Sequence, residues 1–241
     1  MQFEDITKLS GSGGKPGWKT GVSVADVNGD GFLDIYVCDA GSNIDAIRKS
    51  QLYINNGNST FTEKAAEYNL ADTGITTHAA FFDYDKDGDL DCYILNNSFI
   101  PVGSLNYSNK RELRDKDWDV ADILKGGGDK LLRNDNGKFT DVSESTGIYG
   151  SLIGFGLGVT VGDVNGDGLE DFFVGGAKFH SGIFYLQQAS GKFAAKFLEG
   201  VAEQKDKLGE DLGSLLIDMD GDGDLDLYIA RGGTEGQIGA A

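Results

Sequence analysis

Four acidic segments of this 241-residue chain share one spacing of oxygen-bearing side chains. Each follows the pattern Asp-x-Asp/Asn-x-Asp-Gly-x-x-Asp, and they span residues 26–34, 83–91, 163–171 and 218–226. Carboxylates and amides at positions 1, 3, 5 and 9, with a glycine at position 6 that lets the backbone turn, form a tight loop of hard oxygen donors. Magnesium prefers fewer protein ligands and zinc prefers nitrogen or sulfur, so we expect calcium.

A solvated turn is the ordinary interpretation of a single segment rich in Asp and Gly. Four copies with the same glycine and carboxylate positions and the same apolar flanks make calcium binding the stronger interpretation. The helix-loop-helix calcium motif is excluded, because it requires a bidentate Glu at position 12. The residues at that position are all apolar: Val37, Ile94, Val174 and Ile229.

Strand-like segments must hold these loops in place. A run rich in small residues precedes each loop, as at residues 21–25, and a β-branched and aromatic run follows it, as at residues 34–37. The second half of each repeat reads as a hairpin, at residues 51–63, 130–141 and, more weakly, 183–193. The unit is then four antiparallel strands with the acidic loop in the first connection, which is typical of a β-propeller blade. We expect the small-residue strand to lie innermost.

The spacing of the loops also indicates a repeat protein. Their first aspartates are 57, 80 and 55 residues apart, a period that indicates a propeller or a solenoid. Residues 2–7 resemble the outermost strand of a repeat, and the chain ends on a first and a second strand around the fourth loop. We therefore predict a single all-β domain over residues 1–241 with about four blades, an insertion loop at residues 96–129, and either a minimal four-bladed ring or part of a larger one. We favour the second.

The composition excludes several classes of partner. The net charge is -18, although fourteen carboxylates occupy loop positions and four calcium ions would bring the charge to about -10. An acidic surface disfavours nucleic acid and anionic membranes. No apolar run approaches the ~20 residues of a membrane span, and the N-terminus does not resemble a signal peptide. Cys38 and Cys92 occupy different places in their repeats, so we expect two buried free thiols.

These segments resemble the FG-GAP/VCBS repeat family, whose calcium-loop blades also build the integrin alpha-chain propeller. Residues 156–168 and the Leu-Tyr-Ile-Asn-Asn-Gly hairpin that begins at Leu52 carry the resemblance most clearly. It covers nearly the whole chain outside residues 96–129 and the last eleven residues. It implies a seven-bladed or similar propeller, a calcium ion in each loop, and a role in adhesion or ligand display at the cell surface or outside the cell. Four loops are fewer than such a ring holds, which puts ring closure in doubt.

The resemblance also implies which residues hold the ions, about four in number. The side-chain ligands are Asp26, Asn28, Asp30 and Asp34 in loop 1, Asp83, Asp85, Asp87 and Asp91 in loop 2, Asp163, Asn165, Asp167 and Asp171 in loop 3, and Asp218, Asp220, Asp222 and Asp226 in loop 4. The main-chain carbonyls at position 7 belong to Phe32, Asp89, Leu169 and Asp224. Because loops 2 and 4 carry only aspartates, we expect them to bind calcium more tightly than loops 1 and 3.

We expect a non-catalytic, calcium-stabilised module for adhesion or for binding a protein or glycan ligand, with self-association if the ring is incomplete. The first alternative is a lectin-like propeller with Trp18, Tyr107 and Trp118 as sugar contacts. The second is a polysaccharide-active enzyme with His78 or His180 as a base. No nucleophile elbow, zinc site or phosphate loop accompanies these two histidines, and His78 precedes an inner strand, where a packing role is more common.

Overall fold

A computed structural model describes residues 2–41, 48–97, 128–148, 157–176, 181–198 and 209–232, and all structural statements refer to these residues. They form three four-stranded antiparallel sheets, one two-stranded antiparallel sheet and three helices of four residues each. The all-β architecture and the four-stranded unit predicted from the sequence are thereby confirmed. The predicted insertion at residues 96–129 falls mostly outside the described residues, as do Tyr107, Trp118 and His180.

The sheets are numbered 1 to 4 in chain order. Sheet 1 contains β1 (Lys19–Ala25), β2 (Asp34–Asp39), β3 (Gln51–Asn55) and β4 (Phe61–Glu63). Sheet 2 contains β5 (Ile75–Phe82), β6 (Asp91–Asn97), β7 (Lys130–Asn134) and β8 (Phe139–Asp141). Sheet 3 contains β9 (Val159–Gly162), β10 (Asp171–Val174), β11 (Ile183–Gln187) and β12 (Phe193–Phe197), and sheet 4 contains β13 (Glu210–Ile217) and β14 (Asp226–Gly232).

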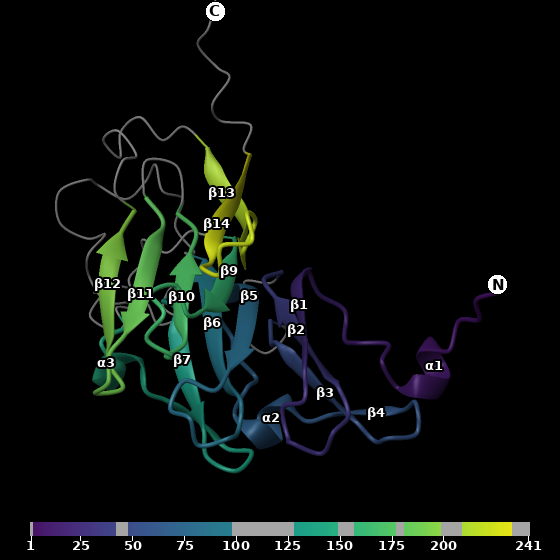
Figure 1. The fold of residues 1–241 in the computed structure, drawn as a ribbon. Helices are drawn as coiled ribbons and strands as arrows, with labels where there is room; N and C mark the ends of the chain where they lie inside the picture. The colour runs from purple at the N-terminus through teal and green to yellow at the C-terminus, as the bar shows by residue number, and fades with distance from the viewer. Residues whose placement is uncertain are drawn as a thin grey trace, which may run out of the picture.

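The first strands of the sheets lie next to one another at the centre of the molecule. β1 contacts β5, β5 contacts β9, and β9 contacts β13, while the later strands of each sheet point outward (Figure 1). Small residues permit this approach: a Cβ at Gly21 would lie 2.5 Å from the carbonyl oxygen of Thr77. The predicted inner position of the small-residue strand is confirmed. The described residues do not close a ring, because the sector between β14 and β1 holds no further sheet (Figure 1).

Two hydrophobic clusters fill the spaces between successive sheets. The cluster between sheets 1 and 2 contains Tyr36, Leu52 and Ile94, together with both cysteines, which are free and buried as expected. The cluster between sheets 2 and 3 is aromatic, and Phe172 at its centre lies 4.9 Å from Tyr185, between ring centroids. Such aromatic packing stabilises a core beyond its buried area. Each sheet is therefore held mainly by its neighbours in the chain.

The described residues contain three short helices: α1 (Thr7–Ser10), α2 (Ala65–Tyr68) and α3 (Ser143–Thr146). The helices α2 and α3 come directly after the outer strands β4 and β8. The outer strand predicted at residues 2–7 was wrong, since residues 2–6 form no strand and α1 begins at Thr7. A strand needs a partner for its backbone hydrogen bonds, and the described chain places none beside this segment. No helix among the described residues is long and apolar enough to cross a membrane.

Candidate metal centres

The four acidic segments form the connections between the first and second strands of the sheets, as predicted. Loop 1 joins β1 to β2, loop 2 joins β5 to β6, loop 3 joins β9 to β10, and loop 4 joins β13 to β14. The glycine at position 6 has a positive φ in every loop, with values of 88° at Gly31, 97° at Gly88, 82° at Gly168 and 97° at Gly223. A side chain would be strained in this conformation, which explains why glycine recurs at this position.

Backbone amides hold the carboxylate at position 1 over the turn. In loop 1, Asp26 Oδ1 accepts a hydrogen bond from the backbone N–H of Asp30 at 3.0 Å, and Asp26 Oδ2 accepts one from Gly31 at 2.8 Å. The first aspartates of the other loops also accept bonds from backbone amides of their own turn: Asp83, Asp163 and Asp218. The carboxylate at position 1 is thus set in place by the loop itself rather than left to rotate in solvent.

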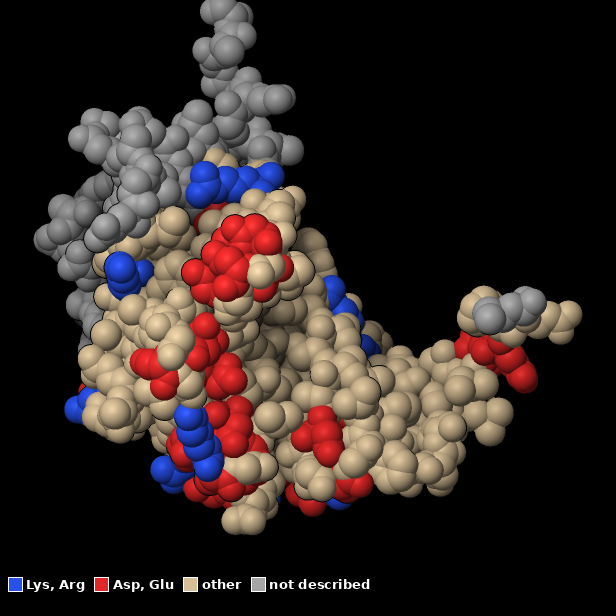
Figure 2. Space-filling model, viewed as in Figure 1, with Lys and Arg blue, Asp and Glu red and all other residues tan. Residues whose placement is uncertain are grey.

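The side chains at position 5 are fixed by the backbone N–H of the residue two positions later in the loop. The position-7 N–H donates to the position-5 carboxylate in all four loops, as from Phe32 to Asp30 at 2.9 Å. In loop 1 the amide of Asn28 also takes part, because its Nδ2 donates to Asp30 Oδ2 at 2.9 Å. These bonds leave the acidic groups of each turn close together, and Figure 2 shows acidic side chains gathered in patches on one face.

Two of the loops bring three carboxylates to one point. Oxygens of Asp83, Asp85 and Asp91 in loop 2 lie within 4.8 Å of one another. Oxygens of Asp218, Asp220 and Asp222 in loop 4 do the same. Each triad could hold a metal ion, since clustered carboxylates repel one another and a divalent cation with oxygen preference would neutralise them. Loops 1 and 3 carry an amide at position 3, and the whole twenty-member ligand set, the two triads included, remains a prediction.

The aspartate at position 9 has a second role that the sequence reasoning missed. Asp34, Asp91 and Asp171 are completely buried. Asp91 accepts hydrogen bonds from the backbone N–H of Tyr84 at 2.9 Å and of Asn134 at 2.8 Å, and the other two carboxylates make the same pair of bonds. This carboxylate therefore ties the start of its loop to the third strand. The sequence did carry a signal for this role, because the position-9 aspartate begins a strand and is followed directly by apolar residues.

Burial changes the acidity of these carboxylates. Removal from water, and more weakly the charges of Asp85 and Asp89, raises the pKa of Asp91 to about 7 against the effect of its two N–H bonds. Burial also raises the pKa of Asp34 and of Asp171. A bound cation would act in the opposite direction, because positive charge favours the ionised carboxylate.

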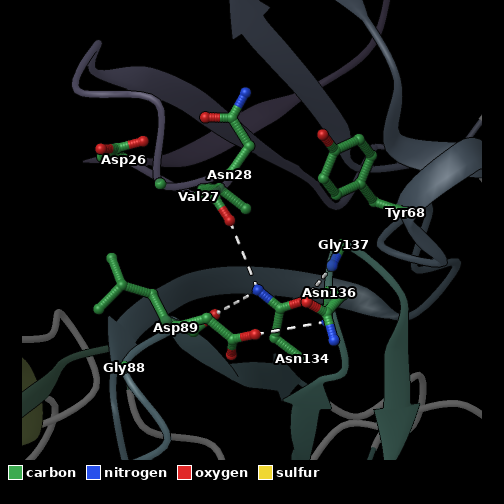
Figure 3. Close-up of a pocket in the computed structure, with 11 residues that line it drawn as sticks. Asp26, Val27, Asn28, Tyr68, Gly88, Asp89, Asn134, Asn136 and Gly137 are labelled. Atoms are coloured by element: carbon green, nitrogen blue, oxygen red, sulfur yellow. Dashed lines mark hydrogen bonds between the residues drawn. The ribbon is translucent and has the colours of Figure 1, made fainter.

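A pocket of about 490 Å³ lies between loops 1 and 2 (Figure 3). Its wall combines both loops with the ring of Tyr68 and the turn at residues 134–137. Asn134 bridges the two loops, because its Nδ2 donates to the carbonyl of Val27 at 3.4 Å and to that of Leu90 at 3.2 Å. Sequence reasoning missed this pocket, since its residues come from segments that are distant in the chain.

One side of the pocket presents an acidic group with spare bonding capacity. Asp89 Oδ2 accepts a hydrogen bond from the backbone N–H of Asn136 at 3.4 Å, whereas Asp89 Oδ1 is buried and has no partner among the described residues (Figure 3). Burial raises the pKa of Asp89. A polar ligand in the pocket could supply the missing donor.

The residues proposed from sequence for sugar contact or catalysis are dispersed. Trp18 is 72% exposed at the start of sheet 1 and does not line this pocket. His78 lies on β5 against Gly21 of β1, and its partial burial lowers its pKa. It is packed between two sheets, as its position before an inner strand predicted.

Comparison with known proteins identifies part of the repeat. Residues 41–94 match the FG-GAP-like repeat family. This segment begins just after β2, runs through β3, β4, α2 and β5, and includes loop 2 and the beginning of β6. The resemblance inferred from the sequence is thereby confirmed over this segment, and it implies that the sheets are propeller blades. No curated protein matches the chain.

Proposed function

We propose that this protein is a non-catalytic binding module whose acidic loops each take up a calcium ion and whose sheets present a surface to a protein or glycan ligand outside the cell. The observation that carries the proposal is the convergence of three carboxylates in loop 2 and in loop 4, within 4.8 Å in each case. The backbone bonds that orient the acidic side chains in all four loops support the same role for loops 1 and 3.

Calcium in these loops is structural. Each loop connects the innermost strand of a sheet to the second strand, so an ion there stabilises the pairing of these two strands. The ion also neutralises carboxylates that otherwise repel one another. Since the site exists only in the folded chain, calcium binding free energy adds to the free energy of unfolding.

An extracellular setting suits this chemistry. Calcium sites of extracellular modules commonly have dissociation constants of about 10⁻⁴–10⁻³ M, because the ion is abundant there. The carboxylates of the four loops are assigned to the proposed ions, and His78 is packed between β1 and β5. Binding rather than catalysis is therefore the activity that these residues support.

Thermal unfolding with and without calcium tests the proposal. We expect the melting temperature to rise with calcium concentration and to fall on addition of a chelator, and we expect magnesium to replace calcium poorly because it requires stricter octahedral geometry. Isothermal titration calorimetry of the chelator-treated protein measures the number of ions directly. A melting temperature that is the same in excess calcium and in excess chelator would exclude structural calcium.

A glycan is the second candidate ligand, and the pocket between loops 1 and 2 favours it. Tyr68 supplies an aromatic wall, Asn28 and Asn136 supply polar groups, and Asp89 Oδ1 lacks a partner among the described residues. An apolar surface with a few convergent polar groups is typical of small-molecule sites. Oligosaccharide titrations followed by NMR test this candidate: Tyr68→Ala should abolish binding and Trp18→Ala should not. Absence of binding by the unaltered protein would contradict it.

A further inference from the structure

The contact between successive sheets repeats through the chain. Each sheet has a following face, which meets the next sheet in chain order, and a preceding face, which meets the one before. On β5, Ala79 and Phe81 belong to the preceding face and pack in the cluster between sheets 1 and 2. Their neighbours Ala80 and Phe82 belong to the following face and pack in the cluster between sheets 2 and 3. The two ends of the row, sheet 4 and sheet 1, show what each face looks like without its partner.

The following face of sheet 4 is open. The third residue of the second strand is aromatic in every sheet, and it is 0% exposed at Tyr36, Tyr93 and Phe173 but 56% exposed at Tyr228. Leu215 and Ile217 on β13 add to this open apolar surface, at 51% and 44% exposed. Covering such a surface with apolar groups would stabilise it by roughly 25 cal/mol per Å² removed from water.

Position 2 of the acidic loops shows the same contrast. Val27 in loop 1 is 2% exposed and Tyr84 in loop 2 is 6% exposed, because each packs into the space before the next sheet. Tyr84 lies 6.2 Å from Phe193 of the next sheet, between ring centroids. Met219 in loop 4 is 66% exposed, although it occupies the same position. The fourth loop thus presents an apolar side chain that is ready to enter a following sheet.

The preceding face of sheet 1 is open in a complementary way. Val22 and Val24 on β1 are 56% and 57% exposed. Counted back from the loop, they correspond to Ala79 and Phe81 on β5, which are packed against sheet 1. Ser23 points to the other side of β1, where its hydroxyl donates to the carbonyl of Ala79 at 2.5 Å. The valines therefore face the side on which an earlier sheet would lie.

A repeated side-chain hydrogen bond links two of the internal junctions, that between sheets 1 and 2 and that between sheets 2 and 3. Asn134 at the end of β7 donates to the carbonyl of Val27 in the loop of the preceding sheet, and Gln187 at the end of β11 donates to that of Tyr84 at 2.5 Å. Asn55 occupies the same place at the end of β3, and its backbone N–H likewise bonds the position-9 aspartate. The Asn55 side chain donates to the carbonyl of Leu33 in its own sheet. The described chain has no sheet before sheet 1, and therefore no preceding acidic loop that could supply a second acceptor. The corresponding acceptor at the other end is the carbonyl of Met219.

The N-terminal helix α1 contacts sheet 1 in the way that α3 contacts sheet 3. A Cβ at Gly11, after α1, would lie 2.9 Å from the carbonyl oxygen of Phe61, just as one at Gly147, after α3, would lie 3.0 Å from that of Phe193. The helix α1 is thus seated on sheet 1 as α3 is seated on sheet 3. Ahead of it, Phe3 is 93% exposed, whereas Phe139 at the same place before α3 is 3% exposed.

From these observations we propose that the protein associates head to tail, with the following face of sheet 4 of one copy packed against the preceding face of sheet 1 of a second copy. Met219 enters the space beside sheet 1 of the second copy, and Asn55 of that copy donates to the Met219 carbonyl. A second copy can supply the matching surface, because each copy carries one open face at each end of its row of described sheets. Such a heterologous contact forms a ring if its rotation closes and a longer assembly if it does not.

Two end variants test this contact, with mass measured by size-exclusion chromatography and light scattering in saturating calcium over a wide range of protein concentration. The unaltered chain should form species of more than one copy. Tyr228→Asp and Val24→Asp should each be monomeric, because each destroys one of the two faces. Phe197→Asp is the matched control, since Phe197 is 54% exposed on the outer strand β12 and the change adds the same charge. Circular dichroism and the calcium-dependent melting temperature verify that each variant is folded.

Mixing the two end variants gives the sharpest readout. Tyr228→Asp keeps an intact sheet 1 face and Val24→Asp keeps an intact sheet 4 face, so an equal mixture should recover dimers that neither variant forms alone. Failure of the mixture to associate, or association that both single variants retain, would overturn the head-to-tail contact. A monomeric unaltered chain at every concentration would overturn the second copy as occupant, and would direct attention to further sheets in a longer chain.

Discussion

At the scale of single residues, the acidic loops combine two kinds of carboxylate. The side chains at positions 1, 3 and 5 are mostly exposed and are oriented by the backbone of the turn itself, whereas the position-9 side chain is buried in the first three loops and bonds two amides from separate segments. The same residue type therefore serves as an ion ligand at the surface and as a cross-link between loop and third strand in the interior. The two roles can be separated by substitution.

Asp91→Ala should destabilise the fold whether or not calcium is present. It leaves the buried N–H groups of Tyr84 and Asn134 unpaired, and each such group costs about 1–3 kcal/mol. We expect the free energy of unfolding to fall by about 2–3 kcal/mol. This is near the lower end of the range for two unpaired groups, because the substitution also removes a carboxylate that is costly to bury. Denaturant unfolding in calcium and in chelator measures it. Asp87→Ala, in the exposed part of the same loop, should lower stability in calcium only, and equal behaviour of the two variants would refute the distinction.

Exchange of a carboxylate and an amide at position 3 should change which of loops 1 and 2 binds calcium more tightly. Asp85→Asn in loop 2 removes a charge and should weaken that site, whereas Asn28→Asp in loop 1 adds one and should strengthen that site. Calcium titration of the two variants by calorimetry provides the comparison. The expectation fails if both changes shift affinity in the same direction.

Asp129 should make stability depend on pH. It accepts hydrogen bonds from the hydroxyl of Tyr93 and the backbone N–H of Asn96, both at 2.9 Å, and burial raises its pKa to about 7. Since an unfolded Asp has a pKa of about 3.9, the folded state holds this proton more tightly. The resulting stabilisation is complete below about pH 4 and is lost as the pH rises to about 7.

The measurement is the melting temperature of Asp129→Asn and of the unaltered protein between those two pH values in saturating calcium. The difference between the two proteins should change in favour of the variant as the pH rises, because the amide does not titrate. A constant difference for Asp129→Asn would show that this carboxyl does not have a raised pKa.

At the scale of elements, the short helices connect one sheet to the next. Each ends on a residue in the left-handed conformation: Gly11 at φ 72°, Asn69 at φ 62° and Gly147 at φ 84°. This residue approaches the first residue of the outer strand of the following sheet, and Asn69 Nδ2 donates to the carbonyl of Phe139 at 3.3 Å. A helix of four residues is not stable alone, so this contact positions it.

Gly147→Ala should therefore lower the stability of the fold by more than the usual penalty for a side chain in the left-handed conformation. Gly191 has a similar φ of 74° with open space around it, so Gly191→Ala should cost about 1–2 kcal/mol, the usual penalty for a side chain in this conformation. Gly147→Ala carries the added clash with the carbonyl of Phe193. Gly147→Asn should be milder, because Asn tolerates the conformation and already occupies this place after α2. Denaturant unfolding of the three variants tests the order, and equal losses for the two alanines would rule out the close contact.

At the scale of the whole molecule, negative charge opposes folding in the absence of metal. The chain has a net charge of -18, and acidic loops of all four sheets add to the repulsion. Calcium and dissolved salt both reduce this repulsion, but salt acts only by screening, over a distance of about 10 Å at 0.1 M. The two should therefore substitute for each other in part.

Added sodium chloride should raise the melting temperature of the chelator-treated protein more than that of the calcium-saturated protein. A relief of about 1 kcal/mol corresponds to roughly 2–4 °C in a chain of this size. Thermal scans at increasing salt, in calcium and in chelator, measure both responses. If salt acts equally on the two forms, loop charge does not limit the stability of the metal-free protein.

The sequence by itself determined the local geometry. The acidic pattern lies within nine consecutive residues, so it predicted both the turn and its glycine at position 6, and the β-branched runs beside it predicted the paired strands. These features depend on neighbours along the chain. The convergence of carboxylates in loops 2 and 4 agrees with that pattern, while the ions themselves remain a prediction.

Only the tertiary structure decided the features that depend on distant segments. The pocket beside Tyr68 and the exposure of Tyr228 each depend on whether another sheet is present. The two hydrogen bonds that Asp91 accepts from Tyr84 and Asn134 depend on the third strand of its own sheet, which lies far along the chain. The N-terminal segment resembles an outer strand in sequence yet forms none, because a strand is completed by its partner's hydrogen bonds. Burial and strand pairing belong to the assembled sheets, so no spacing of residues within one repeat could reveal them.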